Sequence, residues 1–180
     1  MLRVIAGEFK NRTVSVPRSK SANVVTEMIR EALFNILGDM VIGARFADLF
    51  AGSGVVGIEA LSRGASRVTF IDNEKKNIQL IEKNIASLNI GKDRARVWHN
   101  DVFKVSQNES EWAEWDIIFL DPPWLIKDNF MDSLVRSGTV IPGTLTILKR
   151  PSERTEKIAS EYMSLLDQRD YRYGTFYFFR

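Results

Sequence analysis

Short apolar runs alternate with stretches of helical periodicity along most of this chain. The pattern starts with the apolar run 46–50, continues through a helical stretch at 55–63, and reaches a second apolar run at 67–72. Strands that alternate with helices form βαβ units, and their crossovers are almost always right-handed. This alternation therefore predicts an α/β fold with a doubly wound, mostly parallel, Rossmann-like sheet of about seven strands.

The N-terminal half contains three further predicted elements. Residues 2–6 and 12–17 alternate apolar and polar side chains and predict a small β-hairpin before Pro17. A helix is expected over 24–37, where apolar side chains recur at helical spacing up to Gly38. A second helix follows residue 72, with its buried face formed by Ile78, Ile81, Ile85 and Leu88.

The C-terminal half completes the expected sheet. Strands are predicted at 96–98, 115–120 and 143–149, and a helix is predicted around Ile158, Tyr162 and Leu165. The closing segment 171–179 alternates around Gly174 and is expected to form an antiparallel strand.

Length and composition narrow the protein class. A chain of 180 residues favours one domain over 1–180. Without cysteine and with His99 as its one histidine, it lacks the residues for a disulfide framework or a thiolate site, and we expect no metal. No apolar run approaches the roughly 18 residues of a membrane span, and the start lacks a signal-peptide core. We therefore expect a cytoplasmic protein, and nothing requires more than a monomer.

Positive charge is concentrated at the N-terminus. The first 30 residues carry six basic and two acidic side chains, although the whole chain has a net charge of only +2. Such a distribution is typical of a segment that contacts a phosphate backbone, and a solvated terminus is the alternative. We expect residues 1–23 to form a basic hairpin or arm for RNA. The candidate phosphate contacts are Arg3, Lys10, Arg12, Arg18, Lys20 and Arg30.

A glycine-rich turn follows the first apolar run. Ligands of doubly wound sheets bind beyond the carboxyl ends of the strands, so the residues just after each strand are the candidates. Glycines permit a tight turn there, and the next helix offers unpaired N–H groups. The pattern Gly52-x-Gly54-x-x-Gly57 also satisfies the dinucleotide-binding motif, so this turn alone does not choose the cofactor.

Acidic residues follow the next two strands. Asp72, with Asn73 beside it, could accept hydrogen bonds from both hydroxyls of a ribose, and a helix N-cap is the alternative role. After the third strand, Asp101 and Phe103 could bind an adenine amine and pack against its ring, although a turn-forming Asn-Asp pair explains the same residues. Together these positions predict a ligand that resembles a nucleoside.

The segment Asp121-Pro122-Pro123-Trp124 follows the fourth strand and is the most specific signal. Two consecutive prolines hold the backbone extended and remove two N–H donors, so carbonyl and carboxylate acceptors dominate. Trp124 adds an aromatic face on which a base can stack. Acceptors beside a stacking surface predict a planar substrate that carries an NH₂ group.

These motifs, in this order, resemble the Rossmann-fold amino-methyltransferases with a D/N-P-P-aromatic motif. The finer resemblance is to the RsmD-type family, bacterial methyltransferases that act on guanine N2 of 16S ribosomal RNA. It covers essentially the whole chain. The stretches that carry it are 5–7, 10–12, 30–37, 48–65, 119–123 and 173–175.

The resemblance implies S-adenosyl-L-methionine as cofactor and 16S rRNA or the assembled small ribosomal subunit as partner. It implies that Asp48 and the glycine turn hold the methionine end, Asp72 the ribose, and Asp101 with Phe103 the adenine. The implied cofactor residues are Asp48, Phe50, Ala51, Gly52, Ser53, Gly54, Asp72, Asn73, Asp101, Val102 and Phe103. The implied catalytic residues are Asp121, Pro122, Pro123 and Trp124, with no metal.

Three features depart from the family pattern. The chain has 22–26 as Ala-Asn-Val-Val-Thr where the family usually carries Thr-Arg-Pro-Thr, and Met28 stands where a basic residue is common. Trp124 replaces the usual tyrosine, which keeps the stacking surface and loses a phenol hydroxyl.

Three other functions remain open at this point. An adenine-N6 methyltransferase acting on DNA or RNA would share the D/N-P-P motif. An NAD-dependent oxidoreductase would explain the glycines and Asp72 and would leave the 121–124 segment without a role. A non-catalytic RNA-binding module would require a decayed cofactor site, yet both motifs are intact.

Overall fold

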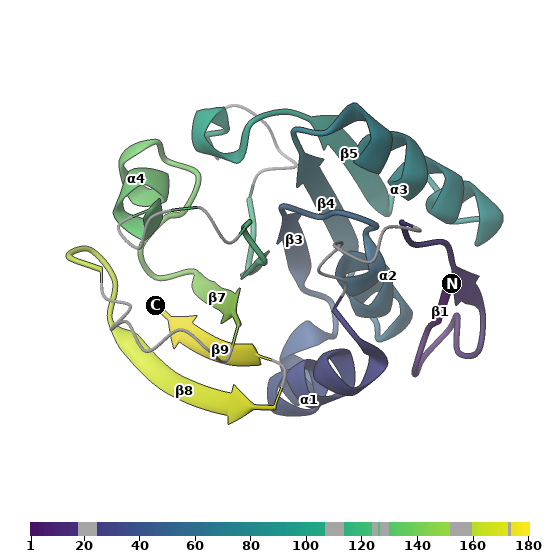
Figure 1. Cartoon of the computed structure of the whole chain (residues 1–180), viewed down its shortest axis with the longest axis horizontal. Helices are drawn as coiled ribbons and strands as arrows, with labels where there is room; N and C mark the ends of the chain where they lie inside the picture. Colours follow the sequence, from purple (N-terminus) through teal and green to yellow (C-terminus); the bar gives the residue numbers. More distant parts are fainter. Residues whose placement is uncertain (18–24, 107–113, 124–125, 127–129, 152–159, 173) are drawn as a thin grey trace.

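A seven-stranded sheet forms the centre of the computed structural model, which describes residues 1–17, 25–106, 114–123, 126, 130–151, 160–172 and 174–180 (Figure 1). The strand order is β5-β4-β3-β6-β7-β9-β8. The strands are β3 (Arg45–Leu49), β4 (Arg67–Asp72), β5 (Ala95–His99), β6 (Ile117–Leu120), β7 (Leu145–Arg150), β8 (Leu165–Tyr171) and β9 (Gly174–Phe179). Neighbours from β5 through β7 are parallel, and β9 runs antiparallel to both β7 and β8. The predicted fold class is confirmed.

The helices lie on both faces of this sheet. They are α1 (Glu27–Leu37), α2 (Val55–Ser62), α3 (Lys75–Ser87) and α4 (Phe130–Arg136), with the short 3-10 turns η1 (Gly38–Val41) and η2 (Val102–Lys104). Side chains alternate across a strand. Phe46 and Phe119 therefore join one core with α1, α2 and α3, and their neighbours Ala47 and Leu120 join a second core with α4 and η2.

Local sequence explains where the first helices begin and how they pack. α1 starts at Glu27, later than predicted, because the Thr26 hydroxyl accepts the N–H of Ile29 at 3.4 Å as an N-cap. α2 can lie directly on β4 because residue 57 is glycine. A Cβ at Gly57 would stand 2.3 Å from the ring of Phe70.

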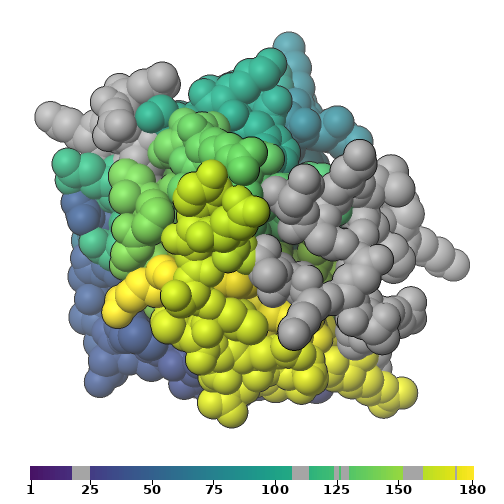
Figure 2. Space-filling model, turned by 90° about the vertical axis from the view of Figure 1, so that its left-hand side faces the viewer, coloured from purple at the N-terminus to yellow at the C-terminus, as the bar shows by residue number. Residues whose placement is uncertain are grey.

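One predicted helix is wrong at its C-terminal end. Leu165, which the helical spacing placed in a helix, begins β8 and pairs with Phe179, while Tyr162 lies in a bend. Ile158 lies outside the described residues. β8 is an edge strand whose outer side is exposed in Figure 2, and five of its seven residues, on alternate faces of the strand, are exposed. Its sequence therefore lacks the apolar alternation that identifies a strand.

One helix was not predicted. α4 buries Phe130, Met131 and Leu134 against the second core, but it has only seven residues. So short a segment shows too few repeats for helical periodicity to be recognised.

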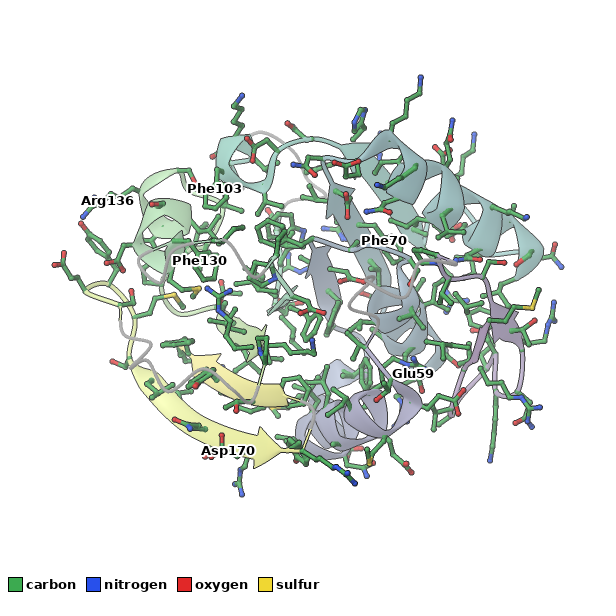
Figure 3. All side chains as sticks on the ribbon, viewed as in Figure 1. Glu59, Phe70, Phe103, Phe130, Arg136 and Asp170 are labelled. Carbon is green, nitrogen blue, oxygen red and sulfur yellow. The ribbon has the colours of Figure 1, made fainter. Side chains whose placement is uncertain are left out.

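The N-terminal hairpin is confirmed as a separate two-stranded antiparallel sheet, β1 (Leu2–Arg3) and β2 (Thr13–Val14). It lies beside α2 and α3, at the opposite end of the molecule from β8 (Figure 1). The segment after β1 is bound by the buried carboxylate of Glu59 on α2, which accepts the N–H groups of Ile5 at 2.9 Å and Ala6 at 3.1 Å (Figure 3).

Two arginines complete this cluster around Glu59. Arg63 donates to its carboxylate at 2.8 Å, and the Arg30 Nε lies 3.9 Å away. Arg30 is fully buried and donates to the carbonyls of Val25 at 2.9 Å and Arg3 at 2.6 Å. The cluster thus ties α1 and the N-terminal segment to α2.

A second contact joins the hairpin to α3. The buried amide of Asn84 accepts the N–H of Ser15 at 2.9 Å and donates to the carbonyls of Ser15 at 2.9 Å and Ser53 at 3.0 Å. Ser53 belongs to the glycine turn, so one side chain connects the end of the hairpin with the predicted cofactor loop.

Within the part of the chain that the structure describes, no helix has the length and apolarity needed to cross a membrane.

Replacing Glu59 with alanine removes the acceptor of two backbone N–H groups and the partner of Arg30 and Arg63. Alanine is the best helix former, so α2 loses no intrinsic propensity. We expect the free energy of unfolding to fall by about 3–5 kcal/mol, because buried donors and charge are left without compensation. Urea denaturation at pH 7 measures it. Glu82→Ala, on the exposed side of α3, is the matched control and should change stability by less than about 0.5 kcal/mol. Equally small effects in both variants would contradict this role of Glu59.

Candidate active site

The predicted site residues gather where the order of the sheet reverses. From β3 the chain proceeds outward to β4 and β5, then returns to β6, which pairs with the other side of β3. The carboxyl ends of β3 and β6 thus flank the switch point at which ligands of such sheets bind. By the alternation of side chains, Asp48, Asp72 and Asp121 point to the same face, the one covered by α1, α2 and α3.

The glycine turn after β3 has an unusual backbone. Phe50, Gly52 and Gly54 all have positive φ angles, of 61°, 56° and 72°. A positive φ at phenylalanine costs of order 1–3 kcal/mol and persists only where surrounding contacts impose it. Those contacts include the N–H of Ala51, which donates to the carbonyl of Ile71 in β4 at 3.0 Å. The turn is therefore shaped by the neighbouring strand as well as by its glycines.

Asp72 at the end of β4 is a hub for the same turn. Its carboxylate accepts the N–H of Gly52 at 2.8 Å and that of Glu74 at 2.8 Å, and the amide of Asn77 lies within 3.1 and 3.2 Å of its two oxygens. The position of Asp72 is therefore compatible with both expected roles. Its carboxylate organises the start of α3, and it lies at the strand end where a ribose would bind.

Asp48 is almost completely buried in β3, with 2% of its surface exposed. Its carboxylate accepts the N–H of Gly57, in the first turn of α2, at 2.9 Å. Burial raises the pKa of Asp48 well above its ordinary value, and the negative charges of Asp121 and Asp72 raise it further. A cationic group bound beside Asp48 would relieve this unfavourable charge.

The end of β5 supplies an aromatic contact. Asp101 caps η2 by accepting the N–H of Phe103 at 3.0 Å. Phe103 then meets Phe50 of the glycine turn edge to face, with ring centroids 6.2 Å apart. His99 contacts the carbonyl oxygen of Asn73 at 3.0 Å, which links the loops after β4 and β5. The predicted adenine and ribose loops are therefore adjacent.

Lys149 is a member of the site that sequence reasoning missed. Its ammonium lies 2.9 Å from Oδ1 and 3.1 Å from Oδ2 of Asp121, and the two side chains are only 7% and 13% exposed. Lys149 is near the end of β7, the strand next to β6. The sequence did offer a signal, because Lys149 is near the end of a predicted strand and Asp121 follows another. A single lysine in an apolar strand does not, however, identify its partner.

The remaining predicted catalytic residues are only partly described. Pro122 is buried, Pro123 is exposed, and the Pro123 carbonyl accepts the N–H of Ile126 at 3.1 Å. Trp124 lies outside the described residues. Of the other predicted cofactor residues, Val102, Ala51 and Ser53 are buried and Asn73 is exposed.

The predicted phosphate contacts divide into three groups. Arg3, Lys10 and Arg12 are exposed on the N-terminal hairpin. Arg18 and Lys20 lie outside the described residues. The prediction that Arg30 contacts phosphate is wrong, because its side chain is fully buried in the Glu59 cluster and is not accessible to a phosphate.

Among the described residues, no group of three or more histidine, cysteine, aspartate or glutamate side chains is placed to hold a metal ion.

Comparison with known proteins gives a family and relatives. The model of the family described as Conserved hypothetical protein 95 matches residues 2–180. The chain is 31% identical to Ribosomal RNA small subunit methyltransferase D of Escherichia coli K12, over 94% of this chain and 90% of that protein. It is 38% identical to YlbH of Bacillus subtilis, over 68% of this chain and 67% of that protein. The solved structure of yhhF from Escherichia coli superimposes with a TM-score of 0.78 at 26% identity, over 99% and 96% of the two chains.

Replacing Asp48 with asparagine should alter how stability depends on pH. Because the folded pKa of Asp48 lies above its ordinary value of 3.8, the folded state binds this proton more tightly than the unfolded chain. Stability is therefore lost as pH rises from about 4 through the folded pKa. The asparagine amide would keep an acceptor for the N–H of Gly57 and carry no charge. We expect the unfolding free energy between pH 5 and pH 8 to fall less in Asp48→Asn than in the parent protein. The unfolding free energy is measured by urea denaturation at each pH. The same pH dependence in both proteins would contradict a raised pKa for Asp48.

Proposed function

The chain belongs to the RsmD family of S-adenosylmethionine-dependent methyltransferases, and from this premise we propose that it methylates the exocyclic N2 amine of a guanine in 16S ribosomal RNA. The observation that carries the proposal is the position of Asp121. Its carboxylate begins the Asp-Pro-Pro-Trp segment at the switch point of the sheet, on the same face as Asp48 and Asp72. The choice of the small-subunit RNA is supported by the E. coli relative, whose name states that substrate class.

The residues at the strand ends fit S-adenosylmethionine. A ligand with a cationic ammonium and sulfonium suits an edge where Asp48 and Asp72 are buried carboxylates. Asp48 and the glycine turn would hold the methionine end, Asp72 the ribose, and Asp101 with Phe103 the adenine. When bound, the cofactor supplies a methyl group on a positively charged sulfur.

The proline segment would position the amine that receives this methyl group. The target base must leave its stack to reach the pocket, which costs a few kcal/mol. Trp124 would stack on the extruded base. Asp121 and the Pro122 carbonyl would accept the two amine protons and thereby reduce conjugation of the nitrogen lone pair with the ring. Alignment of bound reactants can contribute roughly 7–11 kcal/mol, so positioning is the main catalytic effect.

The N-terminal hairpin would bind the RNA backbone. Arg3, Lys10 and Arg12 are exposed on it, and the Glu59 and Asn84 contacts hold it against the two helices that start at the site. Phosphate contacts of this kind position RNA without reading its sequence. With residues 1–23 as such an arm, the whole chain would act as one methyltransferase domain.

Methyl transfer to small ribosomal subunits that lack their native methylation tests the proposal. With methyl-labelled S-adenosylmethionine, we expect label in N2-methylguanosine after digestion of the RNA to nucleosides. Asp121→Ala should lower turnover at least about 10²-fold, because it removes an acceptor for the amine, while binding of S-adenosylhomocysteine measured by calorimetry changes little.

Asp39→Ala is the matched control for that experiment. Asp39 is exposed in η1, which precedes β3. It therefore lies at the amino ends of the strands, away from the carboxyl ends that carry the proposed site. Label in N6-methyladenosine would keep the chemistry and overturn the guanine target. Wild-type turnover in Asp121→Ala would refute the role of Asp121.

Removing charge from the hairpin should weaken RNA binding without changing sequence preference. In Arg3→Ala/Lys10→Ala, we expect the slope of log affinity against log salt to decrease by about one for each lost phosphate contact. Fluorescence anisotropy with a labelled 16S fragment at several KCl concentrations measures it. Arg169→Ala, on β8 at the far edge of the sheet, should leave the slope unchanged. An unchanged slope in the double variant would exclude Arg3 and Lys10 as phosphate contacts.

A further inference from the structure

The ion pair between Lys149 and Asp121 is buried at the centre of the proposed site. The ammonium reaches both carboxylate oxygens, at 2.9 and 3.1 Å, which restrains the plane of the carboxylate as well as neutralising its charge. With 7% and 13% of the two side chains exposed, solvent screens this interaction little.

Stability alone does not explain such a pair. Removing two charges from water costs several kcal/mol each, and well-packed apolar residues of similar volume are often as stabilising as a buried ion pair. One partner, Asp121, already has a proposed role in binding the substrate amine. The other partner, Lys149, touches this carboxylate from the neighbouring strand and has no role yet.

The charges around Asp121 make its ionisation depend on lysine. Burial raises the pKa of Asp121. The positive charge of Lys149 lowers it, and that of Arg150 lowers it to a smaller extent. On the neighbouring strand β3, the carboxylate of Asp48 is close enough that Asp121 raises its pKa. Of the two opposing cations, Arg150 alternates to the other face of β7, where its guanidinium lies over the ring of Phe130 at 4.9 Å. Lys149 is therefore the cation that directly contacts Asp121.

The pairing of β6 with β7 brings Lys149 close to Asp121. Lys149 lies on the same face of β7 as Leu145 and Ile147, and Asp121, directly after β6, points to that face as well. On the other side of β7, Gly174 of β9 lies beside the aliphatic part of Lys149. A Cβ at Gly174 would lie 3.0 Å from the Arg150 carbonyl oxygen and 3.6 Å from Lys149 Cε. A side chain at position 174 would therefore crowd the Arg150 carbonyl, whereas its contact with Lys149 would be an ordinary one.

We propose that Lys149 is a positioning residue, which keeps the Asp121 carboxylate ionised and correctly oriented to accept a hydrogen bond from the substrate amine. This inference rests on the proposed function, because it gives Asp121 its purpose. Each carboxylate oxygen has two acceptor directions. One on each oxygen is used by the ammonium, and another remains available to an amine proton. A protonated Asp121 would present a donor where an acceptor is required.

Lys149→Met and Lys149→Arg test the inference through the pH dependence of turnover. Methionine keeps the aliphatic length and removes the charge, whereas arginine keeps the charge. We expect the acid limb of the pH profile for kcat to move to higher pH by about one unit or more in Lys149→Met, with turnover near neutral pH at least about tenfold lower. Lys149→Arg should retain most of the parent profile. Lys92→Met, an exposed lysine in the loop before β5, should match the parent.

A titration independent of activity separates this inference from the proposed function. The carboxyl ¹³C resonance of Asp121, assigned by its loss in Asp121→Asn, reports ionisation in the protein without substrate. We expect its titration midpoint at higher pH in Lys149→Met than in the parent, with Lys149→Arg close to the parent. An unchanged midpoint in Lys149→Met would overturn the inference even if rRNA is methylated. If no RNA is methylated, the proposed function fails, and the midpoint still decides the role of Lys149.

The double variant Asp121→Asn/Lys149→Met distinguishes a loss of the ion pair from a general folding defect. It contains neither charge of the pair, and asparagine keeps an acceptor that needs no counterion. We expect Lys149→Met to reduce turnover much less in the Asp121→Asn background than in the parent. Equal losses in both backgrounds would show that Lys149 acts independently of Asp121 and would refute the proposal.

Discussion

Five strands of this sheet pair in parallel, so each crossover must return the chain to the end of the sheet at which the strands begin. The alternation of side chains along each strand then determines the face to which its last residue points. In this protein the two constraints place Asp48, Asp72, Asp121 and Lys149 on one face at the carboxyl edge of the sheet. Three carboxylates in so little space are costly, and each is compensated by a specific donor. Gly57 donates to Asp48, Gly52 to Asp72, and Lys149 to Asp121.

A further buried carboxylate, Glu59, lies midway along α2 and organises the N-terminal segment. This helix begins at the glycine turn and carries Glu59 in the middle of its length, where the N-terminal segment and Arg30 converge. The segments 5–7, 30–37 and 59–65, which carry much of the family resemblance, contain no proposed catalytic residue and meet in this cluster. These segments therefore hold the hairpin beside the site. Asn84 adds a direct bridge from Ser15 to Ser53, so the position of the hairpin and the shape of the turn share one buried amide.

The accuracy of the sequence predictions follows the strength of local signals. β4 was predicted with its observed bounds, because its apolar residues are buried and turn residues mark its ends. β8 was mistaken for part of a helix because an edge strand exposed on both faces carries no apolar alternation. Arg30 was assigned to RNA from its charge, and its burial depends on a carboxylate 29 residues later in the sequence, which no local pattern reveals.

The sequence by itself determined the alternation of strands and helices from β3 to β5, the glycine turn, and the acidic residues at the strand ends, because propensity, periodicity and turn chemistry act over a few neighbouring residues. Those signals also placed the candidate site at one edge of a parallel sheet. Only the tertiary structure decided which charges meet. Lys149 lies 28 residues from Asp121, and Arg30 29 residues from Glu59. The Lys149 pair depends on strand register and on the face to which each side chain alternates, and the Arg30 pair depends on how α1 packs against α2. These are properties of the packed sheet, and a buried charge acquires its partner, its pKa and its role only when that packing is complete.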